Sequence, residues 1–220
     1  MVYSGFTIDF NNLPQTLPIF PLGGVLLLPN GRLPLNIFEP RYLAMTDDAL
    51  ATDRLIGIIQ PATSEAQGNQ NSVFKTGCAG RITAFSETED KRYLITLSGL
   101  VRFDVGEEIS TSRGYRRVVP DWSPYKTDYL DEKNFQFNKE RLLTALKRYF
   151  EKKAIDADWE TINKMDDARL VTTLAMICPF DPPEQQALLM AKDIEERAET
   201  IISLLEISTH ETNEVGDARH

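Results

Sequence analysis

Apolar residues near the start of the chain come in short runs that proline and glycine interrupt. Ile19 and Phe20 open the first run, Val25 to Leu28 form the second, and Leu33 to Phe38 form the third. Proline fixes φ and removes a backbone donor, whereas glycine accepts the positive φ of a sharp reversal. Short apolar runs between such residues are typical of β-strands. We therefore predict strands joined by tight turns at Pro21, Gly23, Gly24, Pro29, Asn30, Gly31 and Pro34.

One helix and then further strands are predicted up to Trp122. Pro40 suits a first helical position, and Tyr42, Met45 and Ala49 form one stripe of a helix from Pro40 to about Ala51. After it the chain returns to β-branched and alternating runs. These predict a strongly bent, mixed sheet whose further strands are Leu55 to Ile59, Gly77 to Phe85, Tyr93 to Leu97, Val101 to Ile109 and Tyr115 to Trp122, with a hairpin turn at Thr88 to Lys91.

Helical periodicity replaces this pattern in the second half of the chain. In Asn134 to Ala154, apolar residues recur at the spacing of a core-facing helical stripe: Leu142, Leu143, Leu146, Tyr149 and Phe150. Asp181 and Glu184 flank two prolines as an N-cap and an acid at the third position, and Asp193 with Glu196 repeats this capping pattern. The sequence therefore predicts a small helical bundle with further helices at Asp166 to Cys178, Pro182 to Ala191 and Asp193 to about Ile207.

The change of period near Tyr125 divides the chain. We predict a β-rich lobe over residues 1–125, a helical lobe over residues 126–207, and a polar, aperiodic and disordered tail over residues 208–220. Between two strands, Pro61 to Ser72 is polar and has no apolar residue larger than alanine, so we predict a mobile loop there.

Charge and cysteine content narrow the classes of function. The net charge is −9, and an acidic chain repels the phosphate backbone of nucleic acid. Arg113, Arg116 and Arg117 form the one local basic group, which a solvated strand edge explains most simply. Cys78 and Cys178 lie far apart without a C-x-x-C pattern, so we expect two buried, unpaired thiols in a reducing compartment.

Neither a membrane span nor a secretory leader is predicted. No apolar run approaches the roughly 18 residues of a membrane-spanning helix. The opening stretch lacks a basic region followed by a long apolar one. We therefore expect a cytoplasmic location.

The sequence contains few residues that are candidates for catalysis. Both histidines, His210 and His220, fall in the predicted tail, which leaves no histidine for a triad or a metal cluster in the folded body. The glycine pair near Leu22 lacks the G-K-[ST] of a phosphate-binding loop. Acidic pairs are expected to be solvated charges: Asp47 with Asp48, Glu107 with Glu108, and Asp166 with Asp167. We expect no enzyme activity, no cofactor and no metal.

Several motifs carry a resemblance to a known family. FPLGGVLLLP, PLNIFEPRY and LIGIIQP are followed by GCAGRI, LITLSGLVRF and a helical stretch from Pro179 to Leu205. In order and spacing they resemble the N-terminal substrate-binding domain of Lon-type ATP-dependent proteases, over about residues 14 to 206. The resemblance implies an α+β fold with a PUA-like bent β pseudo-barrel followed by a small helical bundle. Neither the nucleotide-driven unfolding module nor the Ser-Lys proteolytic module of those proteases is represented.

The block from Phe38 to Tyr42 allows two interpretations. As scaffold, Glu39 would favour the helix N-terminus, Arg41 would tie a neighbouring loop, and both aromatic rings would pack beneath. As a binding site, Arg41 and Tyr42 would contact an incoming polypeptide, because aromatic and arginine side chains dominate interface energies. The candidate polypeptide-binding residues are Leu22, Leu26, Phe38, Arg41 and Tyr42.

The expected function follows from the resemblance. It implies a stand-alone, non-catalytic module that binds unfolded or extended polypeptide segments, with a protease as a further candidate partner. Two alternatives stay open: a small-molecule-binding or hydrolytic enzyme using carboxylate or lysine chemistry, and an RNA-binding PUA-like module, which the acidic charge opposes. We expect no nucleic-acid or membrane partner, and self-association through a strand edge or the helical lobe stays open.

Overall fold

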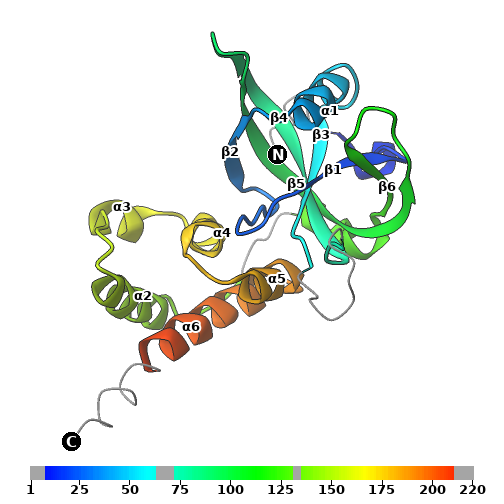
Figure 1. The fold of residues 1–220 in the computed structure, drawn as a ribbon. Helices are drawn as coiled ribbons and strands as arrows, with labels where there is room; N and C mark the ends of the chain where they lie inside the picture. The colour runs from blue at the N-terminus through cyan, green and yellow to red at the C-terminus, as the bar shows by residue number, and fades with distance from the viewer. Residues whose placement is uncertain (1–7, 63–71, 131–134, 211–220) are drawn as a thin grey trace, which may run out of the picture. The chain divides into compact units, whose positions relative to one another are not determined.

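The computed structural model describes residues 8–62, 72–130 and 135–210, with the backbone alone for His210. The chain forms two compact units, Met1–Asp131 and Glu132–His220, referred to below as the β-rich unit and the helical unit. Figure 1 shows strands and one α-helix in the first and only helices in the second. The fold is therefore α+β, as predicted.

The β-rich unit contains one bent six-stranded sheet. Its strand order is β2-β5-β4-β3-β1-β6, and β6 also pairs with β5. That additional pairing closes β5, β4, β3, β1 and β6 into a ring, with β2 attached to β5 outside it. The strands are β1 (Leu17–Pro21), β2 (Arg32–Ile37), β3 (Leu55–Ile59), β4 (Thr76–Glu87), β5 (Tyr93–Ile109) and β6 (Arg116–Asp121).

The helix α1 (Pro40–Leu50) packs on β1 and β3, which run parallel to each other. Its buried residues include the predicted stripe of Tyr42, Met45 and Ala49, so the sequence pattern identified both the helix and its inner face. Proline at the first helical position needs no backbone donor there, which explains why the helix begins where it does.

Two predicted strands are in fact one. The pattern suggested separate strands at Tyr93 to Leu97 and Val101 to Ile109, but β5 runs through both. β2 pairs with its first half and β6 with its second, while β4 pairs along most of its length. Register shifts in the β4–β5 pairing, one of them at Ala79/Gly80, bend the strand without ending it.

The prediction of a strand at Val25 to Leu28 is wrong. This segment has no regular secondary structure, although Leu26, Leu27 and Leu28 are only 0–2% exposed. It crosses β5 so closely that a Cβ on Gly99 would lie 1.9 Å from the carbonyl oxygen of Leu28. An apolar run alone indicates burial and does not distinguish a strand from another buried conformation.

A buried ion pair attaches the short 3-10 helix η2 (Ser123–Tyr129) to β5. The Arg102 and Asp128 side chains are 4% and 6% exposed, and Nη2 of Arg102 lies 2.7 Å from Oδ1 of Asp128. The backbone N–H of Arg102 also donates to Asp128 at 2.9 Å. Beside this pair, Asp104 accepts hydrogen bonds from the hydroxyls of Thr76 and Tyr125, each at 2.7 Å.

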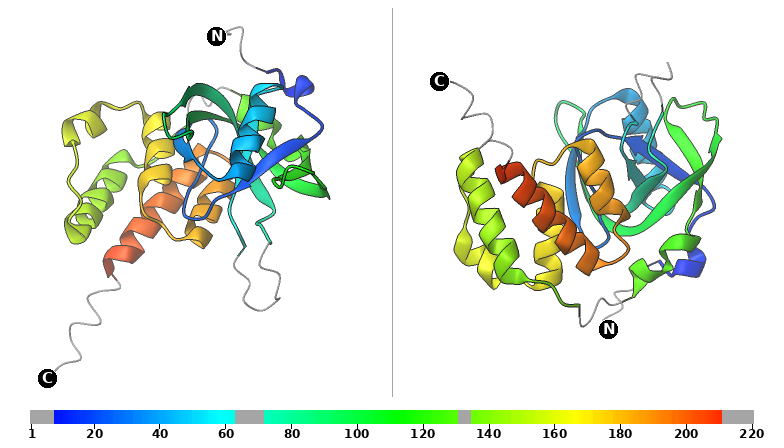
Figure 2. Two further views of the ribbon diagram at one scale, coloured as in Figure 1. Left: turned by 45° about the horizontal axis from the view of Figure 1, so that its top comes forward. Right: turned by 90° about the horizontal axis from the view of Figure 1, so that it is seen from below.

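The helical unit is built around α6, which packs against α2, α4 and α5; Figure 2 shows α6 alongside α2. The predicted capping box is present, because Glu184 N–H donates to Asp181 and Asp181 N–H donates to Glu184. The helices are α2 (Lys139–Lys153), α3 (Trp159–Lys164), α4 (Asp167–Ile177), α5 (Pro182–Met190) and α6 (Ile194–His210).

Two features of this unit differ from the prediction. The helix α3 was not foreseen; it has six residues and buries none of them, so it carries no apolar stripe. Residues Ser208 to His210 belong to α6 and are not the start of a tail, because a helix can continue through polar residues once its apolar face is packed. Residues 211–220, and most of the predicted mobile loop at 61–72, lie outside the described residues.

Candidate functional site

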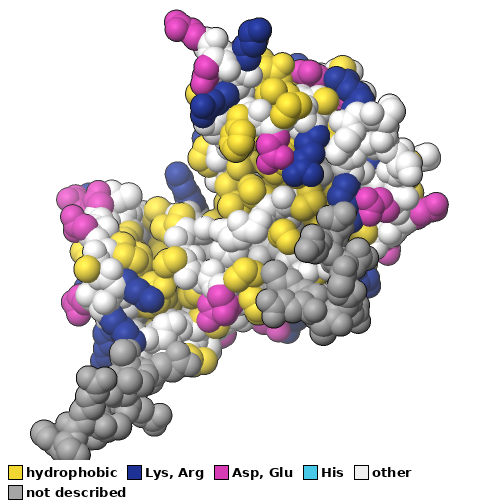
Figure 3. Space-filling model, viewed as in Figure 1, with side chains coloured by type: hydrophobic (Ala, Val, Ile, Leu, Met, Phe, Trp, Pro, Cys, Tyr) yellow, Lys and Arg dark blue, Asp and Glu magenta, His cyan; other side chains and the backbone are white. Residues whose placement is uncertain are grey.

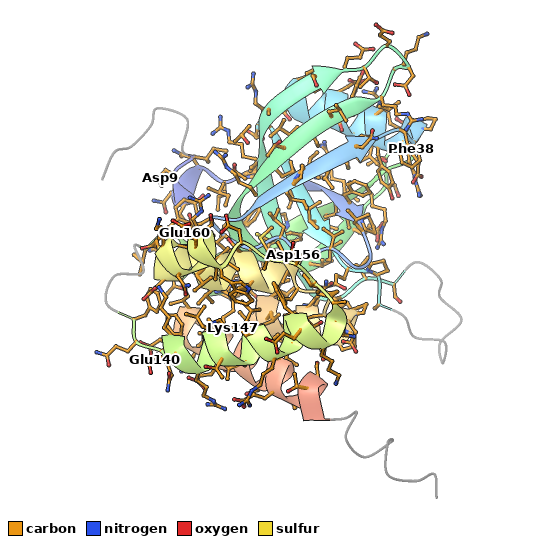
Figure 4. The ribbon with its side chains drawn as sticks, turned by 90° about the vertical axis from the view of Figure 1, so that its left-hand side faces the viewer. Asp9, Phe38, Glu140, Lys147, Asp156 and Glu160 are labelled. Carbon is orange, nitrogen blue, oxygen red and sulfur yellow. The ribbon has the colours of Figure 1, made fainter. Side chains whose placement is uncertain are left out.

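Phe38 is one of the candidate binding residues that lie exposed on the surface. It follows the last residue of β2, and 62% of it is exposed. Figure 4 shows it at the end of that strand. The guanidinium carbon of Arg92 lies 6.0 Å from the centre of its ring, within reach of a weak cation–π contact. Phe38 therefore presents an aromatic ring to the surroundings with an arginine beside it.

Two further exposed apolar side chains lie at the same end of the sheet. Phe85 on β4 is 45% exposed and Leu94 on β5 is 44% exposed. We call Phe38, Phe85 and Leu94 the hairpin surface. In Figure 3, yellow side chains gather over the β-rich unit on the face in view. Contiguous exposed apolar side chains mark interaction sites more often than scattered ones do, so the face on which each of the three lies matters.

The strand register divides the hairpin surface between two faces. Leu94 is opposite Asn36 on β2, and Phe38 follows the last residue of that strand with Arg92 beside its ring, so Phe38 and Leu94 lie at the same end of the β2–β5 pairing. Phe85 is opposite Ile95, one position further, and so belongs to the other face. There its ring meets that of Tyr93 edge-on, with centroids 5.0 Å apart. Phe38 and Leu94 thus form the pair that one bound segment could contact together.

Tyr42 is buried and contributes to the packing of the β-rich unit. It is 6% exposed, and its ring centre lies 4.1 Å from that of Phe20 on β1. Burial raises the pKa of its hydroxyl. Arg41 lies over the outer side of the same ring, with its guanidinium carbon 4.5 Å from the centroid, and pairs with Glu39 at 2.9 Å. The scaffold interpretation therefore describes Tyr42, while Phe38 does not pack beneath the helix as that interpretation expected.

The two leucine candidates are not part of the hairpin surface. Leu26 is 2% exposed and belongs to the core, and Leu22 is partly exposed. A small cavity of about 190 Å³ adjoins Arg41 and Tyr42, and Arg116 is also among its lining residues. Of the five candidates, Phe38 and Arg41 are exposed, Leu26 and Tyr42 are buried, and Leu22 is partly exposed.

Several members of the acidic pairs and of the basic group form ion pairs or helix caps. Arg113 pairs with Asp48, which also accepts a hydrogen bond from the Tyr115 hydroxyl at 2.7 Å. Arg116 pairs with Glu108 at 2.7 Å. In the helical unit Asp166 caps α4, and Asp167 pairs with Lys139 at 2.6 Å. These carboxylates and arginines therefore serve helix starts and ion pairs.

Both cysteines are buried and free, as expected. Burial raises the pKa of the Cys178 thiol to about 12, so this group stays protonated and unreactive at neutral pH. In the part of the chain that the structure describes, no three histidine, cysteine, aspartate or glutamate side chains gather as a metal site would require. Within the same residues no helix is both long and apolar enough to cross a bilayer.

Sequence reasoning missed Phe85, Arg92 and Leu94. A signal was available, because Tyr93, Leu94 and Ile95 are three consecutive bulky apolar residues in an antiparallel strand. A strand with one buried face alternates apolar and polar residues, so a break in the alternation marks an apolar side chain on the outer face. The turn residues next to it indicate that this happens at the end of a hairpin.

The β-rich unit is thus a closed ring of strands with exposed apolar side chains at one end of its sheet. Residues 16–206 match the family model of the ATP-dependent protease La (LON) substrate-binding domain. The chain therefore belongs to the family of Lon substrate-binding domains.

The similarity to complete Lon proteases covers only part of their length. Lon protease 2 of Myxococcus xanthus is 31% identical over 101 residues, covering 46% of this chain and 12% of that protein. The Lon protease of Parabacteroides distasonis is 26% identical over 204 residues, covering 91% of this chain and 25% of that protein. The chain thus spans a quarter or less of these two relatives.

Solved structures share the fold. A Lon N-terminal domain protein from Xanthomonas campestris superposes with a TM-score of 0.59 at 22% identity, covering 86% of this chain and 97% of that one. The N-terminal domain of the Mycobacterium avium complex Lon protease gives a TM-score of 0.54 at 15% identity, with coverages of 87% and 98%. At this level of identity the likeness concerns the fold alone.

Proposed function

We propose that this chain is a non-catalytic module that binds unfolded or extended polypeptide segments through Phe38 and Leu94 of the hairpin surface. The observation that carries the proposal is the exposure of these two apolar side chains, 62% and 44%, at the same end of the β2–β5 pairing. The membership of the chain in a family of substrate-binding domains supports the proposal. The engagement of Asp48, Glu108, Asp166 and Asp167 in ion pairs and caps supports a binding role over carboxylate catalysis.

Contact through side chains fits this surface better than addition of a strand. β2 is the edge strand of the sheet, which in principle could pair with an extended peptide. Pro34 lies in the middle of β2 and lacks a backbone donor, and proline on an edge strand is a common protection against such pairing. Apolar side chains of the bound segment would instead pack on Phe38 and Leu94, with Arg92 beside them.

The same reasoning extends to the cellular setting. Because its relatives are Lon proteases, we propose that the chain works with a protease, to which it presents captured polypeptides in the cytoplasm. We also propose that the closed ring of strands is of the PUA-like kind that the sequence resemblance implies. The pairing of β5 with β6, which completes the ring, supports this assignment.

The test is protection of a thermally unfolding model protein against aggregation by the purified chain without ATP. Replacing both Phe38 and Leu94 by serine should raise the concentration for half protection at least about fivefold, since truncating a central apolar contact typically costs more than 1 kcal/mol. Both side chains are exposed, so the melting temperature should change little. Albumin serves as the inert protein.

A matched control is Met190→Ser on α5, because Met190 is 60% exposed and lies outside the hairpin surface. Protection that is lost with the double variant and kept with Met190→Ser supports the proposal. Equal protection by the double variant and the unchanged chain would contradict it. Loss with Phe85→Ser alone would move the binding site to the opposite face.

A further inference from the structure

The helical unit contains an apolar groove between the end of α2, the short helix α3 and α4. The groove encloses about 300 Å³, at the lower end of the volumes typical of small binding sites. Phe150, Leu170 and Leu174 are 1–6% exposed and form its deep part, whereas Ile155 and Ile177 on its border are 36% and 62% exposed. Exposed branched side chains on the border of an apolar cavity favour a partner that covers them.

The local sequence explains why the groove stays open. α2 ends at Lys153, and the left-handed φ of 53° at its C-cap, Ala154, turns the chain away from the helix. The next helix, α3, is held to α2 by Trp159, whose ring lies 5.9 Å from that of Phe150 and beneath the Lys147 ammonium at 5.5 Å. Because α3 buries none of its own residues, it borders the cavity without filling it. Figure 4 labels Lys147 on α2 and Glu160 on α3, on either side of this region.

The only charged side chains among the lining residues are Asp156 and Asp158. Asp156 accepts from the backbone N–H of Ala157 at 3.0 Å, and Asp158 accepts from the N–H and the hydroxyl of Thr161 at 3.1 and 2.6 Å. These bonds hold the carboxylates in place and lower the pKa of Asp158, so it is anionic at neutral pH. No ion pair of either aspartate occurs within the described residues. An apolar cavity with two anionic groups beside it is complementary to an apolar side chain next to a cation.

The cavity continues along the surface. A second, more open cavity of about 520 Å³ shares Phe150, Ile155, Asp156 and Ala157 with the groove and extends to Trp159 and Lys147. An elongated surface of this kind suits several consecutive residues of a chain, whereas one compact ligand would occupy a single cavity.

We propose that this groove binds short polypeptide segments in which a bulky apolar residue is flanked by lysine or arginine. The inference rests on the proposed polypeptide-binding function and adds a second site with its own sequence preference. The apolar side chain enters between Phe150, Leu174 and Ile177, and the flanking cations face Asp156 and Asp158. Segments flanked by glutamate are disfavoured by the same two aspartates.

The test uses three fluorescein-labelled peptides with a Gly/Ser frame and different centres: Arg-Leu-Phe-Arg, Glu-Leu-Phe-Glu and Arg-Ser-Ser-Arg. Binding to the full chain is followed by fluorescence polarisation at low salt. The first peptide should bind about twofold to tenfold more tightly than the second, as expected for two exposed charge contacts. Added salt should reduce this difference. The third peptide should bind more weakly than the first, because it carries the same arginines but lacks the apolar centre.

Two variants test the assignment of residues. The double change Asp156→Asn and Asp158→Asn should remove the preference for arginine over glutamate; asparagine is as good an N-cap as aspartate, so α3 keeps its start. Ile177→Ser should weaken the binding of the Arg-Leu-Phe-Arg and Glu-Leu-Phe-Glu peptides alike. Because Ile177 is exposed, the variant should fold like the unchanged chain. Circular dichroism melting verifies both variants.

Equal affinity for the arginine and glutamate peptides, or unchanged binding by Ile177→Ser, overturns the groove assignment. That failure is distinguishable from failure of the proposed function. The variant with serine at Phe38 and Leu94 should keep the preference for the arginine peptide, while Ile177→Ser should keep the dependence of aggregation protection on Phe38 and Leu94.

Discussion

The β-rich unit and the helical unit are stabilised by contacts of different range. In the first, β1 pairs with β6, and Arg102 on β5 holds Asp128 of η2, so segments far apart in the sequence close the fold. In the second, each helix begins at a cap formed by residues three positions apart, as at Asp181 and Glu184. The ring of strands in the β-rich unit therefore closes only through long-range pairing, whereas each helix of the second unit starts at a local cap and long-range contacts enter where the helices pack around α6.

Tryptophan fluorescence can follow the two units separately. The chain has two tryptophans; Trp122 lies in the β-rich unit and Trp159 in the helical unit. Replacing one of them by phenylalanine leaves the other as the reporter of its own unit. The comparison of long-range and local stabilisation can therefore be tested on the whole chain with urea.

The largest effect is expected from Asp128→Asn in the β-rich unit. The substitution keeps the shape of the side chain but removes the negative charge that Asp128 places against the buried Arg102 guanidinium. Losing one member of a buried pair costs about 3–5 kcal/mol. The free energy of unfolding reported by Trp122, in a chain with phenylalanine at position 159, should fall by this amount.

The control is the same chemical change at an exposed pair. Lys164 and Glu160 lie on α3 with side chains 72% and 79% exposed. Glu160→Gln should change the free energy of unfolding by less than about 1 kcal/mol, as is usual for surface pairs. If the two substitutions had equal effects, the buried pair would not be the long-range contact that the comparison requires.

An intermediate effect is expected from Asp181→Ala at the start of α5. The variant loses the carboxylate that accepts the Glu184 N–H at 2.9 Å. Loss of an N-cap of this kind costs about 1 kcal/mol. The unfolding midpoint reported by Trp159, with phenylalanine at position 122, should fall accordingly, and Asp181→Asn should restore most of it because asparagine is an equally good cap.

A larger loss of stability for Asp181→Ala than for Asp128→Asn would reverse the comparison between the two units. The helical unit would then depend on a single contact more strongly than the β-rich unit does. Equal stability of Asp181→Ala and Asp181→Asn would show that the cap contributes nothing, and that the apolar stripes alone define the helix start.

The range of the contacts also explains what the sequence could predict. The starts of α1, α4, α5 and α6 depend on residues within one helical turn, and each was predicted within one residue of its observed position. The conformation of Val25 to Leu28 depends on Gly99, which lies in a distant strand. Here the local pattern indicated burial correctly and secondary structure wrongly.

The same limit applies to the candidate site. Phe38 and Tyr42 are both aromatic residues at one strand-to-helix corner, and the sequence alone gave them equal standing. The helical stripe that predicted burial of Tyr42 was visible in the pattern. Phe38 follows the last residue of β2, which pairs with Tyr93 at the start of β5, and no local signal contains this long-range pairing. The apolar groove escaped prediction because α3 has no periodic pattern.

The smallest effect concerns the pH dependence of the β-rich unit through Asp104. Burial raises the pKa of this carboxyl, but hydrogen bonds from Lys75, Tyr125 and Thr76 outweigh it and hold the pKa below its usual value. A carboxyl with a lower pKa in the folded state stabilises the fold above its unfolded pKa, near pH 4, and this contribution is lost as the pH falls through the folded value. Between pH 7 and pH 3, the unfolding midpoint reported by Trp122 should therefore fall more steeply for the unchanged chain than for Asp104→Asn. Parallel curves for the two proteins would show that the contacts of Asp104 do not distinguish its charged form, and would leave Arg102 and Asp128 as the only long-range polar contact tested.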